Sequence, residues 1–266
     1  MDAPDYDSTP PPQRLDDRIA LIWRLATPAS DITQKVSPDG CCEIILHRGT
    51  PPQEQRGDGE WTRQPTAFLY GPLTRVLNLA NPEPLDFIAI RLHPWAVGCL
   101  GPSPRLWRDR AVDLEDIRPG LAGQLSGLYE CAETLDRFSQ LAGPTLDAAL
   151  PVFDAMPVAR RAIEALETDD PGSMTQLAER QGLTERTLSR RLERAVGLNA
   201  KSVMRIARFH RARAAIKAGA DNLSAVAADC GYADQAHMTR DFRRLSGETP
   251  RLIRKPATFD PIYGSG

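Results

Sequence analysis

The 266-residue sequence has no apolar run of 18 residues or more and almost no net charge, with 33 basic against 35 acidic side chains. The missing apolar run excludes a membrane-spanning helix. Its five cysteines are scattered and form no CxxC pair, so we expect neither a disulfide framework nor a zinc site. The acidic, proline-rich start is unlike a secretory signal, and we expect a cytoplasmic protein with reduced thiols.

The near-zero net charge hides an uneven distribution. Residues 157–256 hold 19 basic against 12 acidic side chains, whereas residues 1–156 hold 14 against 22. Eighteen of the 23 prolines also lie in residues 1–156, and this change of composition predicts a domain boundary near residues 150–157. A basic half joined to an acidic half is typical of nucleic-acid binding by the basic half, and a solvated basic helical face is the alternative.

The basic segment contains an internal repeat. Residues 175–197 and 224–247 follow the same pattern at an offset of 49 to 50 residues. Each copy opens with a short alanine-containing helix that ends at a glycine, Gly182 or Gly231, which suits the left-handed backbone of a tight turn. Each continues into a second helix that starts at a capping residue and ends at another glycine. Two copies in register predict two helix-turn-helix units more specifically than one copy would, because single helical hairpins are common.

The second helix of each copy combines a buried stripe with a hydrogen-bonding face. The apolar pairs four residues apart are Leu188 with Leu192 and Met238 with Phe242. The other faces carry arginine and amide side chains, and arginine can bind guanine, and glutamine adenine, through two hydrogen bonds. We therefore expect these two helices to read base edges in the major groove.

The segment between the copies, residues 200–219, is expected to form one helix. Eighteen helical residues span about 27 Å, close to the ~34 Å between successive major-groove segments on one face of B-DNA. Such a helix could hold the two readers beside successive segments of the groove. Its arginines either contact phosphates or form a solvated charged face: Arg205, Arg208, Arg211 and Arg213.

Residues 157–256 resemble the DNA-binding domain of the AraC/XylS family of bacterial transcription regulators, above all along the run AVAADCGYADQAHMTRDFRRLSGETPRLIR. The resemblance implies seven helices, with two helix-turn-helix subdomains joined by a long helix. It also implies that the third and sixth helices enter adjacent major grooves. Double-stranded DNA and RNA polymerase are the implied partners. The sequence departs from the family pattern at Ala200, where proline is usual, and at Leu192 and Met238, where phenylalanine is usual.

The resemblance also implies roles for individual residues by position. The implied base-reading residues are Arg186, Ser189 and Arg190 in the first unit and Gln235, Ala236, Thr239 and Arg240 in the second. The implied phosphate-contacting residues are Thr184, Arg191, Arg194, Asp234, His237, Arg243 and Arg244. No catalytic residue, metal ligand or cofactor is expected.

The complete chain is expected to belong to the α+β class. The predicted units are a disordered tail (1–14), a β-rich sensor or dimerisation domain (15–150), the all-α DNA-binding domain (157–256) and a second tail (257–266). Strands are expected at 19–25, 41–47, 67–70, 76–79 and 87–92, and helices within 121–150. A cupin-like barrel is one form that the β-rich domain can take.

Several residues of the N-terminal half carry a more local prediction. Trp23, the run SPDGCCEIILH and Gly71 resemble a sensor subtype of undefined ligand within the same family. Cys41 and Cys42 are expected on opposite faces of a strand, with one of them in the core. Trp23 and Trp95 are also expected in the core.

The role of the N-terminal half stays open at this point. A small-molecule effector pocket and a homodimerising scaffold without a ligand both fit the sequence, and a ligand-processing enzyme fused to a DNA-binding module is the alternative of a different class. His47 and His93 are far apart and match no metal-ligand spacing. Asp39 and Glu43 are expected to bracket a turn, with Asp39 in an Asx turn, and not to form an acid–base pair. We therefore predict a regulator and not an enzyme.

Overall fold

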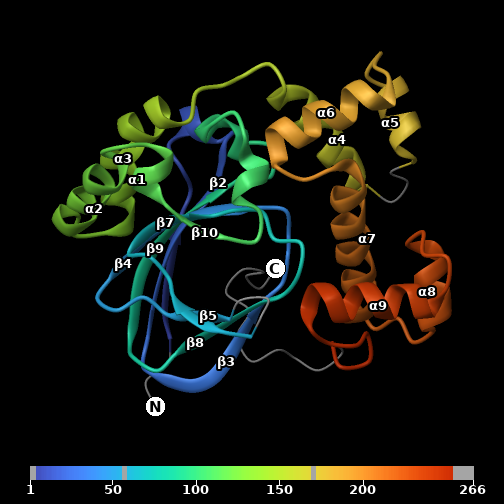
Figure 1. The fold of residues 1–266 in the computed structure, drawn as a ribbon, viewed down its shortest axis with the longest axis horizontal. Helices are drawn as coiled ribbons and strands as arrows, with labels where there is room; N and C mark the ends of the chain where they lie inside the picture. The colour runs from blue at the N-terminus through green and yellow to red at the C-terminus, as the bar shows by residue number, and fades with distance from the viewer. Residues whose placement is uncertain (1–3, 56–58, 169–171, 254–266) are drawn as a thin grey trace.

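Antiparallel strands build the N-terminal half of the molecule and helices build the C-terminal half (Figure 1). The computed structural model describes residues 4–55, 59–168 and 172–253. The strands of these residues are β1 (Asp5–Thr9), β2 (Ile19–Thr27), β3 (Ser30–Val36), β4 (Cys42–Arg48), β5 (Gln53–Gln55), β6 (Trp61–Arg63), β7 (Ala67–Tyr70), β8 (Leu77–Asn81), β9 (Leu85–Leu92) and β10 (Ala111–Asp113). They form a six-stranded sheet in the order β1-β2-β9-β4-β7-β10 and a four-stranded sheet in the order β3-β8-β5-β6.

Helices follow the strands along the chain. The α-helices are α1 (Leu114–Ile117), α2 (Leu121–Cys131), α3 (Leu135–Ala149), α4 (Met156–Leu166), α5 (Met174–Glu179), α6 (Glu185–Val196), α7 (Ala200–Lys217), α8 (Leu223–Asp229) and α9 (Gln235–Ser246). Short 3-10 helices occur at η1 (Gln13–Leu15), η2 (Val97–Leu100) and η3 (Pro104–Trp107). The fold is therefore α+β, with a β-rich first half and a helical second half, as predicted.

The six-stranded sheet has two buried faces, because successive side chains of a strand point to opposite sides. One face of β4 carries Cys42, Ile44 and Leu46, and the other carries Glu43, Ile45 and His47. The first set packs in the core together with Leu125 of α2 and Phe138 of α3. The second set faces a cavity toward the four-stranded sheet. Cys42 is buried in the core while Cys41 lines the cavity, so the prediction of opposite faces is confirmed.

The predicted strands correspond to β2, β4, β7, β8 and β9 within two residues at each end. The other five strands were not predicted, because they are short or rich in polar residues and depend on pairing partners that are distant in sequence. The disordered tail predicted for residues 1–14 is wrong in its described part, because Asp5–Thr9 pair with β2 and the Thr9 hydroxyl bonds to Asp136 of α3. The tail predicted at 257–266 lies outside the described residues.

The buried hydrophobic residues are not divided at the predicted domain boundary. The segment 150–155 does separate α3 from α4, but one continuous core runs from the six-stranded sheet through both of these helices to α6. Leu188 and Leu192 of α6 belong to it and are completely buried. A separate core holds Phe209 of α7 and Phe242 of α9 together with other apolar residues of α7, α8 and α9. The first helix-turn-helix unit therefore shares its core with the N-terminal half, and the second unit has its own.

Candidate nucleic-acid interface and N-terminal cavity

The first helix-turn-helix unit consists of α5, a glycine turn and α6. Ser173 and Gln176 cap α5 reciprocally, so the orphan backbone amides of its first turn have partners. Gly182 has φ +65°, the left-handed conformation predicted for the turn. Thr184 then caps α6 by accepting a hydrogen bond from the backbone amide of Thr187 at 3.2 Å. These local signals fix the angle at which α6 leaves the turn.

The second unit repeats this construction with different side chains. Asn222 caps α8 by accepting hydrogen bonds from two backbone amides, and Gly231 takes φ +77° in the turn. Asp234 caps α9 by accepting a 2.6 Å hydrogen bond from the amide of His237. Met238 and Phe242 are fully buried, as the apolar stripe predicts. Both recognition helices end at a left-handed glycine.

The side chains predicted to read bases lie on the outer faces of α6 and α9. Arg186, Arg190, Ala236 and Arg240 are exposed, and Ser189, Gln235 and Thr239 are half-buried. On α9, four of them and Arg243 line one shallow hollow. Two of these groups already have intramolecular partners, because the Thr239 hydroxyl donates to the Gln235 carbonyl at 2.8 Å and Ser224 donates to Gln235 Oε1 at 3.1 Å.

The side chains predicted to contact phosphates divide into three groups. Thr184 and Asp234 act as helix caps, and the His237 ring packs against Tyr232 at 5.2 Å between centroids. Arg194 forms an ion pair with Asp154 at 3.0 Å, and Arg244 donates to the Thr74 carbonyl at 3.4 Å. Arg191 is half-buried, and Arg243 is exposed. Their positions leave the phosphate assignment as a prediction.

Helix α7 links the two units as the single rod that the sequence predicts (Figure 1). Its 18 residues rise about 27 Å. The arginines along α7 differ from both predicted roles, because three of them bind the second unit. Arg205 pairs with the buried Asp241 at 3.4 Å, Arg208 donates to the Gly231 carbonyl at 3.0 Å, and Arg211 donates to the Cys230 carbonyl at 3.4 Å. The sequence signal for this role was Asp241, because an acid beside the apolar stripe of α9 needs a basic partner.

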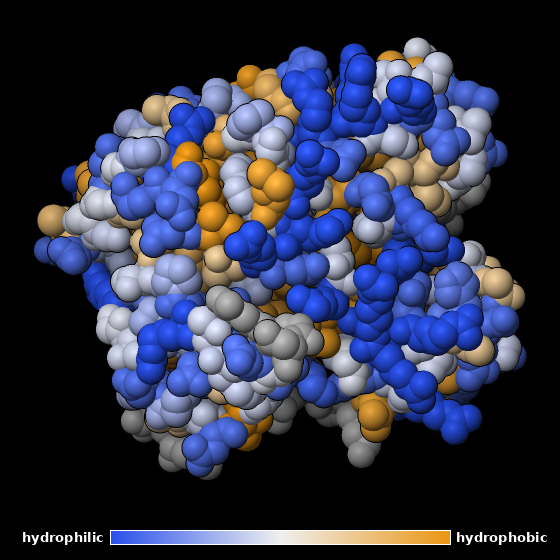
Figure 2. Space-filling view, viewed as in Figure 1, coloured by the Kyte–Doolittle hydropathy of each residue, from blue (hydrophilic) through white to orange (hydrophobic). Residues whose placement is uncertain are grey.

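The two units contact the N-terminal half in different ways. The first does so through apolar and backbone packing, where a Cβ on Gly98 of η2 would meet the Arg194 carbonyl oxygen at 2.4 Å. The second does so through polar contacts. The Val76 amide donates to the Arg244 carbonyl at 3.0 Å, and Lys35 pairs with Glu248 at 3.5 Å. Figure 2 shows hydrophilic side chains over most of the visible face of the C-terminal half.

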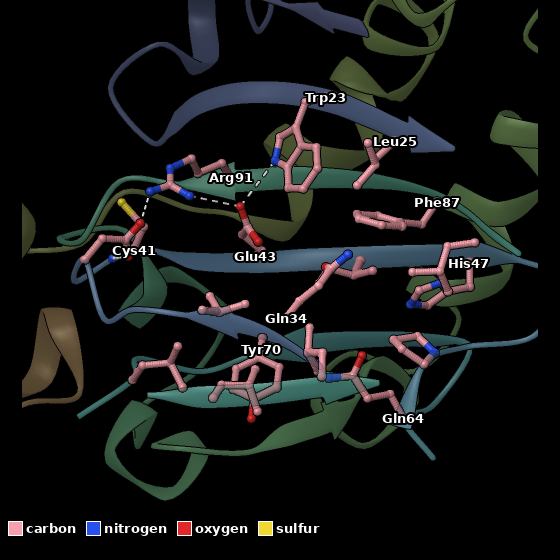
Figure 3. Close-up of a pocket in the computed structure, with 18 of the residues that line it drawn as sticks. Trp23, Leu25, Gln34, Cys41, Glu43, His47, Gln64, Tyr70, Phe87 and Arg91 are labelled. Atoms are coloured by element: carbon pink, nitrogen blue, oxygen red, sulfur yellow. Dashed lines mark hydrogen bonds and ion pairs between the residues drawn. The ribbon is translucent and has the colours of Figure 1, made fainter. Parts of the chain in front are cut away.

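A cavity of about 100 Å³ lies between the two sheets of the N-terminal half (Figure 3). Its walls include Trp23, which is buried as predicted, together with Tyr70, Phe87 and a set of leucines. Trp95 is also buried, in the core of the first unit. Pockets that bind small molecules are concave and mostly apolar with a few polar groups, and this cavity has those properties.

One end of the cavity holds a cluster of charged groups. Arg91 donates to Glu43 at 3.0 Å and also pairs with Asp39 (Figure 3). Asp39 accepts a 2.8 Å hydrogen bond from the Cys41 amide, which is the predicted Asx turn. Burial raises the pKa of Glu43 to about 7, and the hydrogen bond from the Trp23 indole opposes that shift. Asp39 and Glu43 therefore share one cation and do bracket a turn.

His47 marks the other end of the cavity. Its side chain is 8% exposed, and neither ring nitrogen has a hydrogen-bond partner among the described residues. Burial lowers the pKa of His47 to about 4, so the ring is neutral at pH 7.

The described residues contain no group of three or more His, Cys, Asp or Glu that could hold a metal ion. Among those same residues, no helix is long and apolar enough to cross a membrane.

Two protein families match the chain, one over each half. Residues 177–256 match a family described as a helix-turn-helix domain, and residues 7–113 match one described as a domain of unknown function (DUF6597). The second match covers Trp23, the turn at 37–41 and Gly71, the features that resembled a sensor of undefined ligand.

Curated relatives match the C-terminal part. The HTH-type transcriptional activator RhaS of Escherichia fergusonii is 35% identical over 83 residues, which are 31% of this chain and 30% of that protein. RhaS of Pectobacterium carotovorum is 30% identical over 81 residues, which are 30% of this chain and 29% of that protein. The chain thus spans about 30% of the length of these relatives.

Two solved structures illustrate the range of structural similarity. A transcriptional regulator with an AraC-type DNA-binding domain from Chromobacterium violaceum is 24% identical with a TM-score of 0.34, covering 37% of this chain and 89% of that one. ToxT from Vibrio cholerae O395 is 10% identical with a TM-score of 0.46, covering 98% of this chain and 99% of that one. The two helix pairs on one linking helix, each capped and joined by a glycine turn, lie where these sequence matches fall. Residues 177–256 therefore form a helix-turn-helix domain similar to those of AraC/XylS transcription regulators.

Proposed function

We propose that the protein is a sequence-specific DNA-binding transcription regulator that reads two adjacent major-groove segments. The observation that carries the proposal is the pair of equivalent helices, α6 and α9, each with exposed arginine on its outer face and both attached to α7. Arginine at such positions can recognise guanine with two hydrogen bonds, each such pair contributing about 1–3 kcal/mol of discrimination. The basic surroundings supply attraction to phosphates that does not depend on sequence.

Selection of bound DNA from a random pool, followed by sequencing, tests this proposal. For each bound chain we expect one asymmetric motif with two short conserved segments. Arg190→Ala and Arg240→Ala should each weaken binding by about 1–3 kcal/mol and relax base preference in different segments. Arg160→Ala, on α4 outside both readers, is the matched control and should retain the preference. If both reader variants bind the selected site like the wild-type protein, the assignment of α6 and α9 is wrong.

We also propose that the N-terminal half modulates the second unit through the turn between β3 and β4. In this turn the Pro38 carbonyl accepts a 2.8 Å hydrogen bond from His210 of α7. A second cavity, of about 420 Å³, lies between this turn and α7, and Asp39, Cys41 and Arg91 line both cavities. A molecule bound between the sheets would therefore act on groups that also face the linking helix.

Two further partners are proposed on the family resemblance alone. RNA polymerase is the protein partner proposed for a regulator of this family, and a homodimer is the proposed assembly on DNA. Selected sites that contain two spaced copies of the motif would support the homodimer, whereas a single copy bound by one chain would argue against it.

A further inference from the structure

The walls of the N-terminal cavity set the size and character of what it can hold. Trp23, Tyr70 and Phe87 contribute aromatic surface, and a set of leucines contributes aliphatic surface. The volume of about 100 Å³ is of the order of the ~150 Å³ cavity that accommodates one benzene ring. An apolar body of about one ring therefore fits these walls.

The charges of the lining disfavour an anion. Arg91 is the single basic side chain among the described lining residues, and it is already paired with both Asp39 and Glu43. Two carboxylates therefore face one guanidinium. A ligand carboxylate or phosphate would have to compete with both of them for Arg91, and it would place a third negative charge in a largely apolar space.

The Glu43 carboxylate still has an acceptor to offer. Its Oε1 atom accepts from both the Trp23 indole at 3.2 Å and Arg91 at 3.0 Å, and no described residue donates to Oε2. Figure 3 shows this carboxylate between the Arg91 guanidinium and the Trp23 indole nitrogen. A buried carboxylate with an oxygen that accepts from no described residue is a favourable environment for an ammonium group, because a charge-assisted hydrogen bond is stronger than a neutral one.

The far end of the cavity offers a different group. His47 lies four residues from Glu43 on the same face of β4, and its neutral ring has both nitrogens buried without a partner among the described residues. A buried polar group without a partner destabilises the fold, so a ligand hydroxyl that meets this ring would remove a cost already present.

We infer that the cavity binds a small organic amine, with its ammonium on Glu43 beside Trp23, its ring against the aromatic walls and a neutral hydroxyl toward His47. The inference rests on the proposed function in one respect, because this amine would be the effector of the regulator. Binding itself requires no DNA, so the two proposals can fail separately.

Calorimetric titration of the full chain with matched probes tests the inference. Phenethylamine, 2-phenylethanol and 3-phenylpropionate share one phenethyl body and carry a cationic, a neutral and an anionic head group. We expect the amine to bind at least tenfold more tightly than the alcohol, and the carboxylate more weakly than both. Tyramine, which adds a hydroxyl at the far end of the ring, should bind more tightly than phenethylamine.

Variants assign these preferences to side chains. Glu43→Gln should remove the preference for amine over alcohol while retaining the alcohol, and His47→Phe should remove only the gain from tyramine. Glu130→Gln, an exposed acid on α2, is the charge-matched control and should leave all affinities unchanged.

Three results would overturn the inference: 3-phenylpropionate binding as tightly as phenethylamine, no binding of any probe at millimolar concentration, or an unchanged amine preference in Glu43→Gln. The first two are measured on the wild-type protein, so they decide the matter even if Glu43→Gln does not fold. Amine binding without selection of a DNA site would instead contradict the proposed function and leave this inference standing.

Discussion

The two helix-turn-helix units are alike in construction and unlike in attachment. Both have a capped first helix, a left-handed glycine in the turn and a basic second helix. The first unit packs into the core that begins in the β-sheet, whereas the second has a core of its own. Outside α7, the second unit contacts the N-terminal half through polar groups such as the exposed Lys35–Glu248 pair.

Because of this difference, moving the two units relative to the β-domain costs different amounts of free energy. Exposed ion pairs contribute about 0–1 kcal/mol each, while fully burying one large apolar side chain contributes about 1.5–3 kcal/mol. Moving the first unit relative to the β-domain would expose core residues such as Leu188 and Leu192, which are fully buried. Moving the second unit together with the C-terminal part of α7 would break mainly polar contacts to the N-terminal half. The second unit is therefore the one that a signal from the N-terminal half can shift at low cost.

The largest expected effect comes from emptying the separate core of the second unit. Phe242 is fully buried, with its ring 4.9 Å from that of Phe209. Phe242→Ala should lower the free energy of unfolding of α8 and α9 by about 3–5 kcal/mol and leave the β-sheet unchanged. Leu192→Ala, in the shared core, should instead destabilise α6 and the sheet together. Hydrogen exchange resolved by segment measures both, and equal loss of protection everywhere in Phe242→Ala would contradict separate cores.

Lowering the pH should destabilise the β-domain and the first unit, which share one core, and leave the second unit unaffected. The pKa of His47 is lowered to about 4 in the folded state from about 6.5, so its contribution to stability is present above pH 6.5 and is lost as the pH falls toward 4. Between pH 7.5 and 4.5 the free energy of unfolding of the β-domain, measured with urea, should fall by about 2–3 kcal/mol more in the wild-type protein than in His47→Leu. The same pH dependence in both proteins would show that His47 is not the buried neutral group.

A smaller effect is expected at the contact between η2 and α6. A Cβ on Gly98 would lie 2.4 Å from the Arg194 carbonyl oxygen and 2.7 Å from the Phe153 ring. Gly98→Ala should therefore lower the free energy of unfolding of the β-domain and the first unit by about 1–3 kcal/mol. Gly123→Ala on α2 is the control, because its Cβ would meet nothing within 4 Å and alanine favours a helix. Thermal unfolding of both variants checks this, and equal midpoints would mean that the contact is loose.

The smallest effect concerns the polar contact of the second unit. Lys35→Ala removes an exposed ion pair with Glu248 and should speed exchange of the Val76 amide, which donates to Arg244, by up to about fivefold. The difference should shrink in high salt, which screens exposed charges. Arg63→Ala breaks the comparable exposed pair with Glu83 inside the N-terminal half and should leave Val76 unchanged. If Arg63→Ala speeds exchange of the Val76 amide as much as Lys35→Ala does, the Lys35–Glu248 pair does not specifically hold the second unit.

Much of the helical half could be predicted because its signals are local. The glycine turns, the caps at Thr184 and Asp234 and the apolar pairs depend on residues within a few positions of each other. Strands β1, β3 and β5 were missed because their polar residues form strands only when a distant partner supplies hydrogen bonds. The roles of the α7 arginines were missed for the same reason.

The two helix-turn-helix units, their linking helix and the residue types on their outer faces can all be read from the sequence. These follow from capping, backbone preference and helical periodicity, which act over a few residues. The three-dimensional packing was needed to show that the first unit is joined to the β-domain by a shared core and the second by polar contacts. It alone brought Glu43, Arg91 and His47 to one cavity, because charge pairing and burial depend on neighbours that the chain supplies from distant positions.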